Sequence, residues 1–281
     1  MGIQLKRRYL DARRSLKIML DLRRRKRLIG TKPVLEGEDI VVSLTSYPPR
    51  YPSLHLVIES LLGQTLLPNR VVLYIARSQR ATLPTRLTRM QDSRFEIKFV
   101  DDLKSYKKLL PALDDFSTST IVIVDDDVIY PVDLLHDLVA TGRAYPGSVV
   151  CGRAHRLRTN VDGTLLPYRS WEFDVSDAAA KRPSTNIMPT GMGGVLYPPG
   201  SMVDRVRDIE EAMRLCPQGD DIWFFWMARL NGTRIVRIDQ SFTPLHPTGS
   251  QDEALWHNNL TGGGNDPQIQ SINAIYPLPM A

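Results

Sequence analysis

The sequence predicts an α/β fold in which a mostly parallel central sheet is flanked by helices. Short runs of aliphatic and β-branched residues alternate with segments of helical apolar spacing between residues 40 and 143. Polar and acidic residues follow several of these runs, at the strand ends where such sheets bind their ligands. The composition, 42% hydrophobic and 24% charged over 281 residues, is that of a globular protein.

The elements of the first half follow from local signals. Ser53 is expected to cap the first helix, Gly63 to lie near its end, and Pro131 to open the third helix. Strands are predicted within 40–50, 70–76, 94–102 and 121–124, and helices over 53–65, 105–116 and 131–143.

The pattern is less regular after residue 144. Residues 158–190 read as a loop-rich insert in which Trp171 is isolated, and 190–199 are glycine-rich and then apolar. Strands are predicted in 148–158 and 233–239, an apolar helix over 219–232, and a polar loop over 257–268. We therefore divide the chain into an N-terminal arm (1–32), an α/β domain (38–250) and a polar C-terminal tail (251–281).

The expected location is the cytoplasm. The two cysteines, Cys151 and Cys216, imply no disulfide framework and favour a reducing compartment. No run of residues is long and apolar enough to span a bilayer, and no apolar signal-peptide core is visible near the N-terminus.

The formal net charge of +5 is concentrated in the arm, where the run 23–27 is entirely basic. Residues 4–29 read as a basic amphipathic helix. This helix could be solvated or docked on its own domain, or could lie on an anionic membrane surface at the inner face of the cell membrane. Binding to nucleic acid is disfavoured, because Tyr9 is the only aromatic residue in the arm. The apolar residues of its stripe are Leu5, Tyr9, Ala12, Leu16 and Met19.

Three consecutive aspartates, Asp125, Asp126 and Asp127, follow the apolar run 121–124. Carboxylates at the tip of a buried strand repel one another, and a bound divalent cation would offset that repulsion. A solvated acidic turn is the alternative interpretation.

The ordered motifs "SLTSYPPR", "VDDLKSYKKLLPAL", "IVIVDDDVIYP", "GMGGVLYPP", "GDDIWF" and "PLHP" resemble those of glycosyltransferases of the GT-A fold, of the kind that builds bacterial surface polysaccharides. The resemblance covers residues 40 to 247. It implies a GT-A-like, Rossmann-like catalytic domain and a donor that is a nucleotide-diphospho-sugar, expected to be a UDP-sugar. It also implies a glycan or lipid-linked acceptor.

The resemblance further implies a metal site that holds Mn²⁺ or Mg²⁺, both of which suit carboxylate ligands. Asp127 matches the metal ligand of the family's DxD motif, and Asp125 matches the residue that contacts ribose or metal-bound water. Asp126 is the middle position, with no assigned role. His246 matches a histidine that often completes the site. A divalent metal would neutralise the charge of the diphosphate leaving group.

The donor-binding residues are likewise implied by the resemblance. Asp101 and Asp102 would contact the base or ribose, and Lys104, Lys107 and Lys108 the diphosphate, although at least one of these lysines is expected on a solvated helix face. The strand-following residues Thr45, Tyr47 and Arg50 would surround the base. Gly193 and Gly194 would let backbone approach the donor sugar.

The motif "GDDIW" supplies the candidate base, because inverting members place an acidic residue at a helix start beneath the acceptor hydroxyl. We favour Asp220, which follows Gly219, with Asp221 in reserve, since neighbours on a helix point about 100° apart. Helix capping is the plain alternative.

Two other functions fit parts of the sequence. "DDDV" also matches haloacid-dehalogenase-type phosphatases, in which Asp125 would be the nucleophile and Asp127 the acid, but the motif lies far into the chain. A non-enzymatic protein that binds nucleic acid or a membrane through its basic arm would leave the acidic cluster unexplained. The sequence therefore predicts a metal-dependent, inverting glycosyltransferase.

Overall fold

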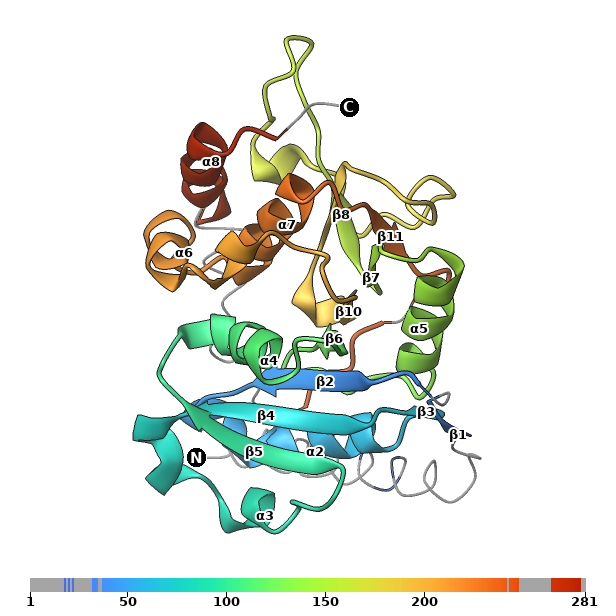
Figure 1. Ribbon diagram of the computed structural model, residues 1–281, viewed down its shortest axis with the longest axis vertical. Helices are drawn as coiled ribbons and strands as arrows, with labels where there is room; N and C mark the ends of the chain where they lie inside the picture. The colour runs from blue at the N-terminus through green and yellow to red at the C-terminus, as the bar shows by residue number, and fades with distance from the viewer. Residues whose placement is uncertain are drawn as a thin grey trace, which may run out of the picture.

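The computed structural model describes residues 18, 20, 22, 32–34, 37–241, 243–247 and 264–278. Within these residues a seven-stranded sheet has the order β11-β7-β10-β6-β2-β4-β5 (Figure 1). The strands are β2 (Ile40–Thr45), β4 (Arg70–Ala76), β5 (Phe95–Val100), β6 (Thr120–Ile123), β7 (Val149–Cys151), β10 (Val195–Tyr197) and β11 (Ile235–Arg237).

The sheet is mostly parallel, as the sequence predicted. Strand β2 pairs in parallel with β4 and β6, β4 with β5, and β7 with β11, whereas β10 is antiparallel to both of its neighbours. From β2 the chain builds one side of the sheet through β4 and β5, and then crosses to β6 on the other side. The reversal of strand order between β2 and β6 is a topological switch point, where open α/β sheets form a ligand crevice.

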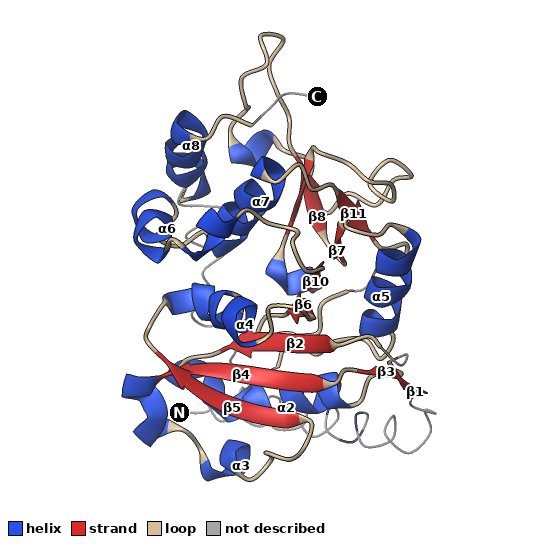
Figure 2. Cartoon of the chain, viewed as in Figure 1, coloured by secondary structure: helices blue, strands red, loops and turns tan. Residues whose placement is uncertain are grey.

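Helices cover both faces of the sheet (Figure 2). They are α2 (Tyr51–Leu62), α3 (Thr85–Thr88), α4 (Leu110–Asp115), α5 (Leu134–Ala144), α6 (Ile209–Leu215), α7 (Asp220–Leu230) and α8 (Asn265–Ile275). Short 3-10 helices are η1 (Pro48–Arg50), η2 (Arg77–Thr82), η3 (Lys104–Lys108), η4 (Tyr168–Ser170), η5 (Gly191–Gly193) and η6 (Asp204–Arg207). Small two-stranded sheets pair β1 (Lys32–Pro33) with β3 (Leu66–Leu67), and β8 (Ala154–Arg156) with β9 (Ile187–Pro189).

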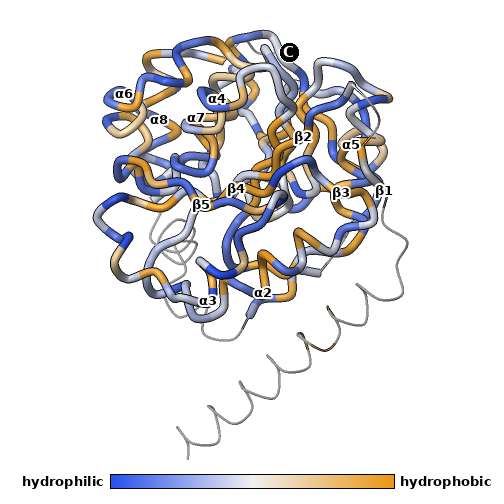
Figure 3. Tube along the Cα trace, turned by 60° about the horizontal axis from the view of Figure 1, so that its bottom comes forward, coloured by the Kyte–Doolittle hydropathy of each residue, from blue (hydrophilic) through white to orange (hydrophobic). Residues whose placement is uncertain are grey.

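Two apolar clusters form the core, one on each face of the sheet. Successive residues of a strand point to opposite faces, so Val41 packs with α4 and α7 while Val42 packs with α2 and α5. Both faces are covered, which explains why the central parallel strands β2 and β4 are mostly apolar in the sequence and in Figure 3.

The start of α2 differs from the prediction. The helix begins at Tyr51, with Arg50 at the N-cap position, and no side chain caps it. Pro52 lies in the first turn, where its missing N–H costs no hydrogen bond. Ser53 therefore is not the cap, and its hydroxyl instead donates to the carbonyl of Arg50 at 3.4 Å.

The predicted strand over 148–158 is divided into β7 and β8, which belong to different sheets. Gly152 lies between them, and a side chain there would collide with the carbonyl of Gly193. Trp171 is not isolated: it is buried, with its ring centroid 5.1 Å from that of Tyr168. Trp171 and Tyr168 both belong to the core cluster that contains α7, which ties the insert to the domain.

The C-terminal segment contains more structure than the expected polar loop. Asn265 begins α8, which packs against α7. Gln218 donates its backbone N–H to the Gln268 side chain, and the indole of Trp226 donates to the carbonyl of Tyr276. These contacts join the segment to α7 and to the residues just before it.

Most of the basic arm, including its predicted helix 4–29 and stripe, lies outside the described residues. Ile18 and Leu22 are buried in the core cluster that contains α2, and Leu20 is exposed. None of the helices in the described part of the chain is long and apolar enough to cross a membrane. Cys151 and Cys216 are both free and buried, in agreement with the absence of a disulfide framework.

Candidate active site

A cavity of about 1060 Å³ opens beyond the carboxyl ends of β2 and β6, at the switch point of the sheet. It gathers segments that are more than 200 residues apart in the chain. Thirteen residues that the sequence singled out line it: Thr45, Tyr47, Arg50, Asp102, Lys104, Lys107, Lys108, Asp125, Asp126, Asp127, Asp220, Asp221 and His246.

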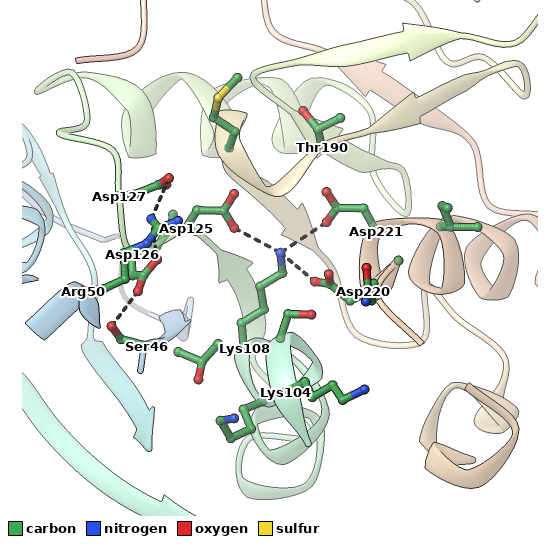
Figure 4. Close-up of a pocket in the computed structure, with 18 of the residues that line it drawn as sticks. Ser46, Arg50, Lys104, Lys108, Asp125, Asp126, Asp127, Thr190, Asp220 and Asp221 are labelled. Carbon is green, nitrogen blue, oxygen red and sulfur yellow. Dashed lines mark hydrogen bonds and ion pairs between the residues drawn. The ribbon is translucent and has the colours of Figure 1, made fainter. Parts of the chain in front are cut away.

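Lys108 is the hub of this site (Figure 4). Its ammonium nitrogen lies 3.1 Å from Asp125 Oδ1, 2.7 Å from Asp220 Oδ2 and 3.3 Å from Asp221 Oδ1. The side chain is only 6% exposed. One buried cation thus links the tip of β6 to the first turn of α7.

The backbone around Lys108 is fixed from two sides. Ser43, inside β2, donates its hydroxyl to the carbonyl of Lys108 at 2.6 Å. Tyr106 donates its hydroxyl to the carbonyl of Cys216 at 2.6 Å, just before α7. These two hydrogen bonds anchor η3 to both the sheet and the segment that precedes α7, and so hold the backbone of Lys108 in place.

A second cation, Arg50, forms ion pairs with Asp126 and Asp127, the other two aspartates at the tip of β6. Its guanidinium lies 2.7 Å from Asp127 Oδ2 and 3.3 Å from Asp126 Oδ1, and its side chain is 8% exposed. The hydroxyl of Ser46 also donates to Asp126. The repulsion predicted for the three aspartates is therefore offset, in this structure, by Arg50 and Lys108.

The carboxylates of this cluster outnumber its two cations, Arg50 and Lys108. The carboxylates are those of Asp125, Asp126, Asp127, Asp220 and Asp221. Burial raises the pKa of Asp126 to about 7; Arg50 and Ser46 oppose the rise, and the neighbouring carboxylates add to it. Burial also raises the pKa of Asp221 to about 6 against the opposing effect of Lys108. Burial alone would lower the pKa of Lys108, but its three carboxylate partners outweigh it and raise that pKa, so the lysine stays charged.

Gly191, the first glycine of "GMGG", approaches the hub most closely. A β-carbon there would lie 2.5 Å from Lys108 Nζ and 2.7 Å from Asp125 Oδ1. Its backbone N–H donates to Asp221 Oδ2 at 3.0 Å. Gly191 thus leaves room for the cation and orients one carboxylate.

Gly193 and Gly194 do not line the cavity, in contrast to the prediction. Gly193 packs on the backbone of Arg153, and Gly194, with φ of +75°, faces Leu134 of α5. Their lack of side chains serves the packing of β7 and β10 against neighbouring segments.

Asp220 and Asp221 both line the cavity and both contact Lys108, so this geometry alone does not separate the two candidates for the base. They occupy the first turn of α7 after Gly219, and the long lysine side chain lies within reach of both. The Asp220 side chain is 11% exposed and that of Asp221 is 28% exposed. Neither makes a capping hydrogen bond at the N-cap, which is Gly219.

The predicted nucleotide contacts divide into two groups. Asp101 is exposed, lies outside the cavity lining and pairs with Arg77 at 3.3 Å. Lys107 is buried and bonds to Asp102, whereas Lys104 is exposed at the cavity, with its ammonium 3.4 Å from the carbonyl of Pro217. Only Lys104 therefore matches the expected lysine on a solvated face.

The residue types at the strand tip suit a hard divalent cation. His246 Nδ1 lies 2.7 Å from the backbone carbonyl of Asp127, and metal-binding histidines commonly make a hydrogen bond of this kind with the ring nitrogen that does not coordinate. The excess of carboxylates over cations in the cluster also favours binding of a metal cation there. However, no three His, Cys, Asp or Glu side chains of the described residues are gathered closely enough to hold a metal. Asp125, Asp127 and His246 therefore suit a divalent metal by their chemistry. Asp127 is engaged by Arg50 at 2.7 Å, so that ion pair would have to open before Asp127 could bind the metal.

Parts of the site were not identified from the sequence. Lys108 was predicted only as one of three lysines near a diphosphate, and Gly191 was not singled out. The first glycine of "TGMGG" was an available signal for Gly191. The cavity-lining Arg153 lies in "CGRAHR", a segment that carries no motif.

No family model and no curated protein matches this chain. Among solved structures, the crystal structure of 4-diphosphocytidyl-2C-methyl-D-erythritol synthase aligns with 78% of this chain and 96% of its own. The identity is 12% and the TM-score is 0.46. So distant a likeness says nothing about the activity of this chain.

Proposed function

We propose that this protein is a glycosyltransferase that takes its sugar from a nucleotide-diphospho-sugar. One observation carries the proposal: the six sequence motifs that resemble GT-A glycosyltransferases all reach, or directly support, one cavity at the switch point of the sheet. In α/β sheets this is where nucleotides are bound.

The donor would lie across the ends of β2 and β6. Thr45 and Tyr47 offer contacts for the base, and the exposed ammonium of Lys104 offers charge for the diphosphate. Asp125, Asp127 and His246 would hold Mn²⁺ or Mg²⁺, whose positive charge would offset that of the departing diphosphate. A UDP-sugar is the donor that we expect.

The transfer itself needs one base. The acceptor hydroxyl oxygen forms a bond to the anomeric carbon, the bond from that carbon to the diphosphate oxygen breaks, and the hydroxyl proton passes to a carboxylate. We now favour Asp221 over Asp220, because its carboxylate is more open to the cavity and its pKa of about 6 is closer to neutrality. Asp220, held 2.7 Å from Lys108, would position that lysine.

The acceptor would be a glycan or a lipid-linked glycan used in surface polysaccharide synthesis, and the protein would act in the cytoplasm. The basic arm 4–29 would then hold the enzyme at the anionic inner face of the membrane, where a lipid-linked acceptor is presented. This part of the proposal rests on the charge of the sequence.

The proposal is tested by thermal unfolding of the full chain in the presence of a panel of nucleotide sugars, each with and without Mn²⁺. A ligand that binds only the folded state raises the melting temperature. We expect one nucleotide sugar to stabilise the protein, and more so with Mn²⁺. Stabilisation by none of them, together with phosphate release from p-nitrophenyl phosphate, would favour the phosphatase alternative.

A further inference from the structure

A second group of residues lines the cavity on the side of β8 and β9, away from the strand tips. Arg153 precedes β8, and Thr190 follows β9 and adjoins Gly191, whose N–H binds Asp221. Arg153 donates to the hydroxyl of Thr190 at 3.2 Å. A ligand group held by Arg153 would therefore lie close to the candidate base.

The charge of Arg153 is not neutralised by a close carboxylate. Its ion pair with Asp174 spans 4.0 Å, and that carboxylate also lies 3.9 Å from Arg237. Arg50 and Lys108, in contrast, each have a carboxylate at 2.7 Å. The Arg153 side chain is 25% exposed and faces the cavity.

The neighbouring His155 cannot satisfy Arg153 either. Burial, followed by the charge of Arg153, lowers the pKa of His155 to about 3, so the ring is neutral. A neutral imidazole has a single acceptor nitrogen. The ring therefore accepts either the backbone N–H of Asp174 at Nδ1, 3.0 Å away, or the Arg153 guanidinium at Nε2, 3.2 Å away, but not both. The contacts of Arg153 with His155 and Thr190 both use the nitrogen Nη1, so its other N–H groups keep hydrogen-bonding capacity for a ligand.

An aromatic wall stands beside this guanidinium. The ring centroid of Phe173 lies 4.6 Å from that of His155 and 5.3 Å from that of Tyr168, and Phe173 meets each of these rings edge to face. All three residues line the cavity, and Phe173 is 39% exposed there. An exposed aromatic ring in a cavity offers an apolar surface to a ligand, such as the C–H face of a sugar ring.

We propose that this subsite, formed by Arg153, Thr190 and Phe173, selects an acceptor sugar that carries an anionic group. The anionic oxygens bind the guanidinium of Arg153, and the sugar ring packs on Phe173. A carboxylate, as in a uronic acid, and a phosphate ester share this chemistry. The inference rests on the proposed function, because it assigns these residues to the acceptor of that reaction.

The test measures the affinity of the full chain for three probes by ligand-observed NMR titration: methyl β-glucuronide, glucose 6-phosphate and neutral methyl β-glucoside. We expect at least one anionic probe to bind about 10-fold or more tightly than the neutral one. The probe that binds also identifies carboxylate or phosphate as the preferred group. Equal affinities for all three probes, or binding of none, would overturn the inference.

Substitutions test whether the preference for anionic probes depends on Arg153. Arg153→Gln should remove the preference for the anionic probes, and Arg153→Lys should retain part of it. Phe173→Ala should weaken binding of all three probes. The matched control is Arg158→Gln, since Arg158 is exposed, lies outside the cavity lining and pairs with Glu172 only at 3.9 Å. An unchanged preference in Arg153→Gln, or an equal loss in Arg158→Gln, would place the anion elsewhere and overturn the inference.

Binding of nucleotide sugars to the same samples separates this inference from the proposed function. If the anionic sugar binds through Arg153 but no nucleotide sugar binds, the subsite stands and the glycosyltransferase proposal fails. If nucleotide sugars bind and the anionic preference is absent, the acceptor inference alone fails.

Discussion

The ammonium of Lys108 lies 2.7 Å from the carboxylate of Asp220, and this contact joins η3 to the first turn of α7. Asp125 and Asp221 approach the same nitrogen at 3.1 and 3.3 Å. A single cation thus sets the distance between the strand-tip aspartates and the candidate base.

Removal of that cation should be strongly destabilising. Lys108→Met leaves three carboxylates facing one another without a counter-charge, and loss of one partner from a buried ion pair costs about 3–5 kcal/mol of unfolding free energy. The control is Lys98→Met, whose partly exposed ion pair with Asp115 at 3.0 Å should contribute about 0–1 kcal/mol. Urea denaturation measures both, and similar losses for the two variants would show that Lys108 is not the hub.

Gly191 should tolerate no side chain. Gly191→Ala would place a β-carbon 2.5 Å from Lys108 Nζ, so the side-chain ends of the cluster must shift and we expect the melting temperature and the nucleotide affinity to fall. The matched control is Gly142→Ala in α5, where the new β-carbon would make ordinary contacts of 3.6 Å with Leu196. Alanine is also the better helix former at that position by roughly 0.5–1 kcal/mol. Melting temperatures and nucleotide affinities of the two variants check this prediction, which fails if Gly191→Ala behaves like the control.

The strand-tip carboxylates should make the protein less stable as the pH rises. The pKa of Asp126 is raised to about 7 in the folded state, so between about pH 4 and pH 7 the folded protein binds its proton more tightly than the unfolded chain does. The unfolding free energy therefore falls over this range, by the order of a few kcal/mol. Asp221 acts in the same direction up to about pH 6.

Asp126→Asn removes this titration, so its unfolding free energy should depend less on pH than that of the unchanged protein. Asp101→Asn, at an exposed position, is the control. Denaturation series at several pH values between 4 and 7 provide the comparison. A slope that is the same in Asp126→Asn and in the unchanged protein would refute the assignment.

The basic arm yields a prediction that rests on sequence alone. Each Lys or Arg near an anionic surface contributes ~1 kcal/mol, screened by salt. Replacing the five basic residues of 23–27 with glutamine should release the protein from anionic vesicles at low salt while nucleotide affinity stays unchanged. Co-sedimentation measures this, and equal binding to neutral and anionic vesicles would leave the arm as a docking element.

The sequence predicts most accurately the strands that are buried on both faces of the sheet. Strand β4 was predicted over its observed range, because a parallel strand covered on both faces is apolar throughout. The split of β7 from β8 was not predictable, since it depends on the contact of Gly152 with Gly193, more than 40 residues away in the chain.

In the candidate site too, features that depend on contacts between distant residues could not be predicted from the sequence. Motifs located most of the cavity-lining residues, because the carboxyl ends of neighbouring parallel strands meet at one edge. The hub role of Lys108 depends on the anchoring of η3 by Ser43 and Tyr106, a tertiary effect that no local pattern reports. Arg153 faces the cavity because of the small β8–β9 sheet, which the sequence did not predict.

Metal-dependent binding of a nucleotide sugar in the cavity is tested most directly by calorimetric titration of the full chain with nucleotide-diphospho-sugars in excess Mn²⁺, for the unchanged protein, Asp127→Ala and Asp101→Ala. Asp127 lines the cavity beside His246, whereas Asp101 lies outside it. We expect saturable binding of one nucleotide sugar, weakened at least about 10-fold in Asp127→Ala and unchanged in Asp101→Ala. No binding of any nucleotide sugar, or an affinity that Asp127→Ala leaves intact, would contradict this expectation.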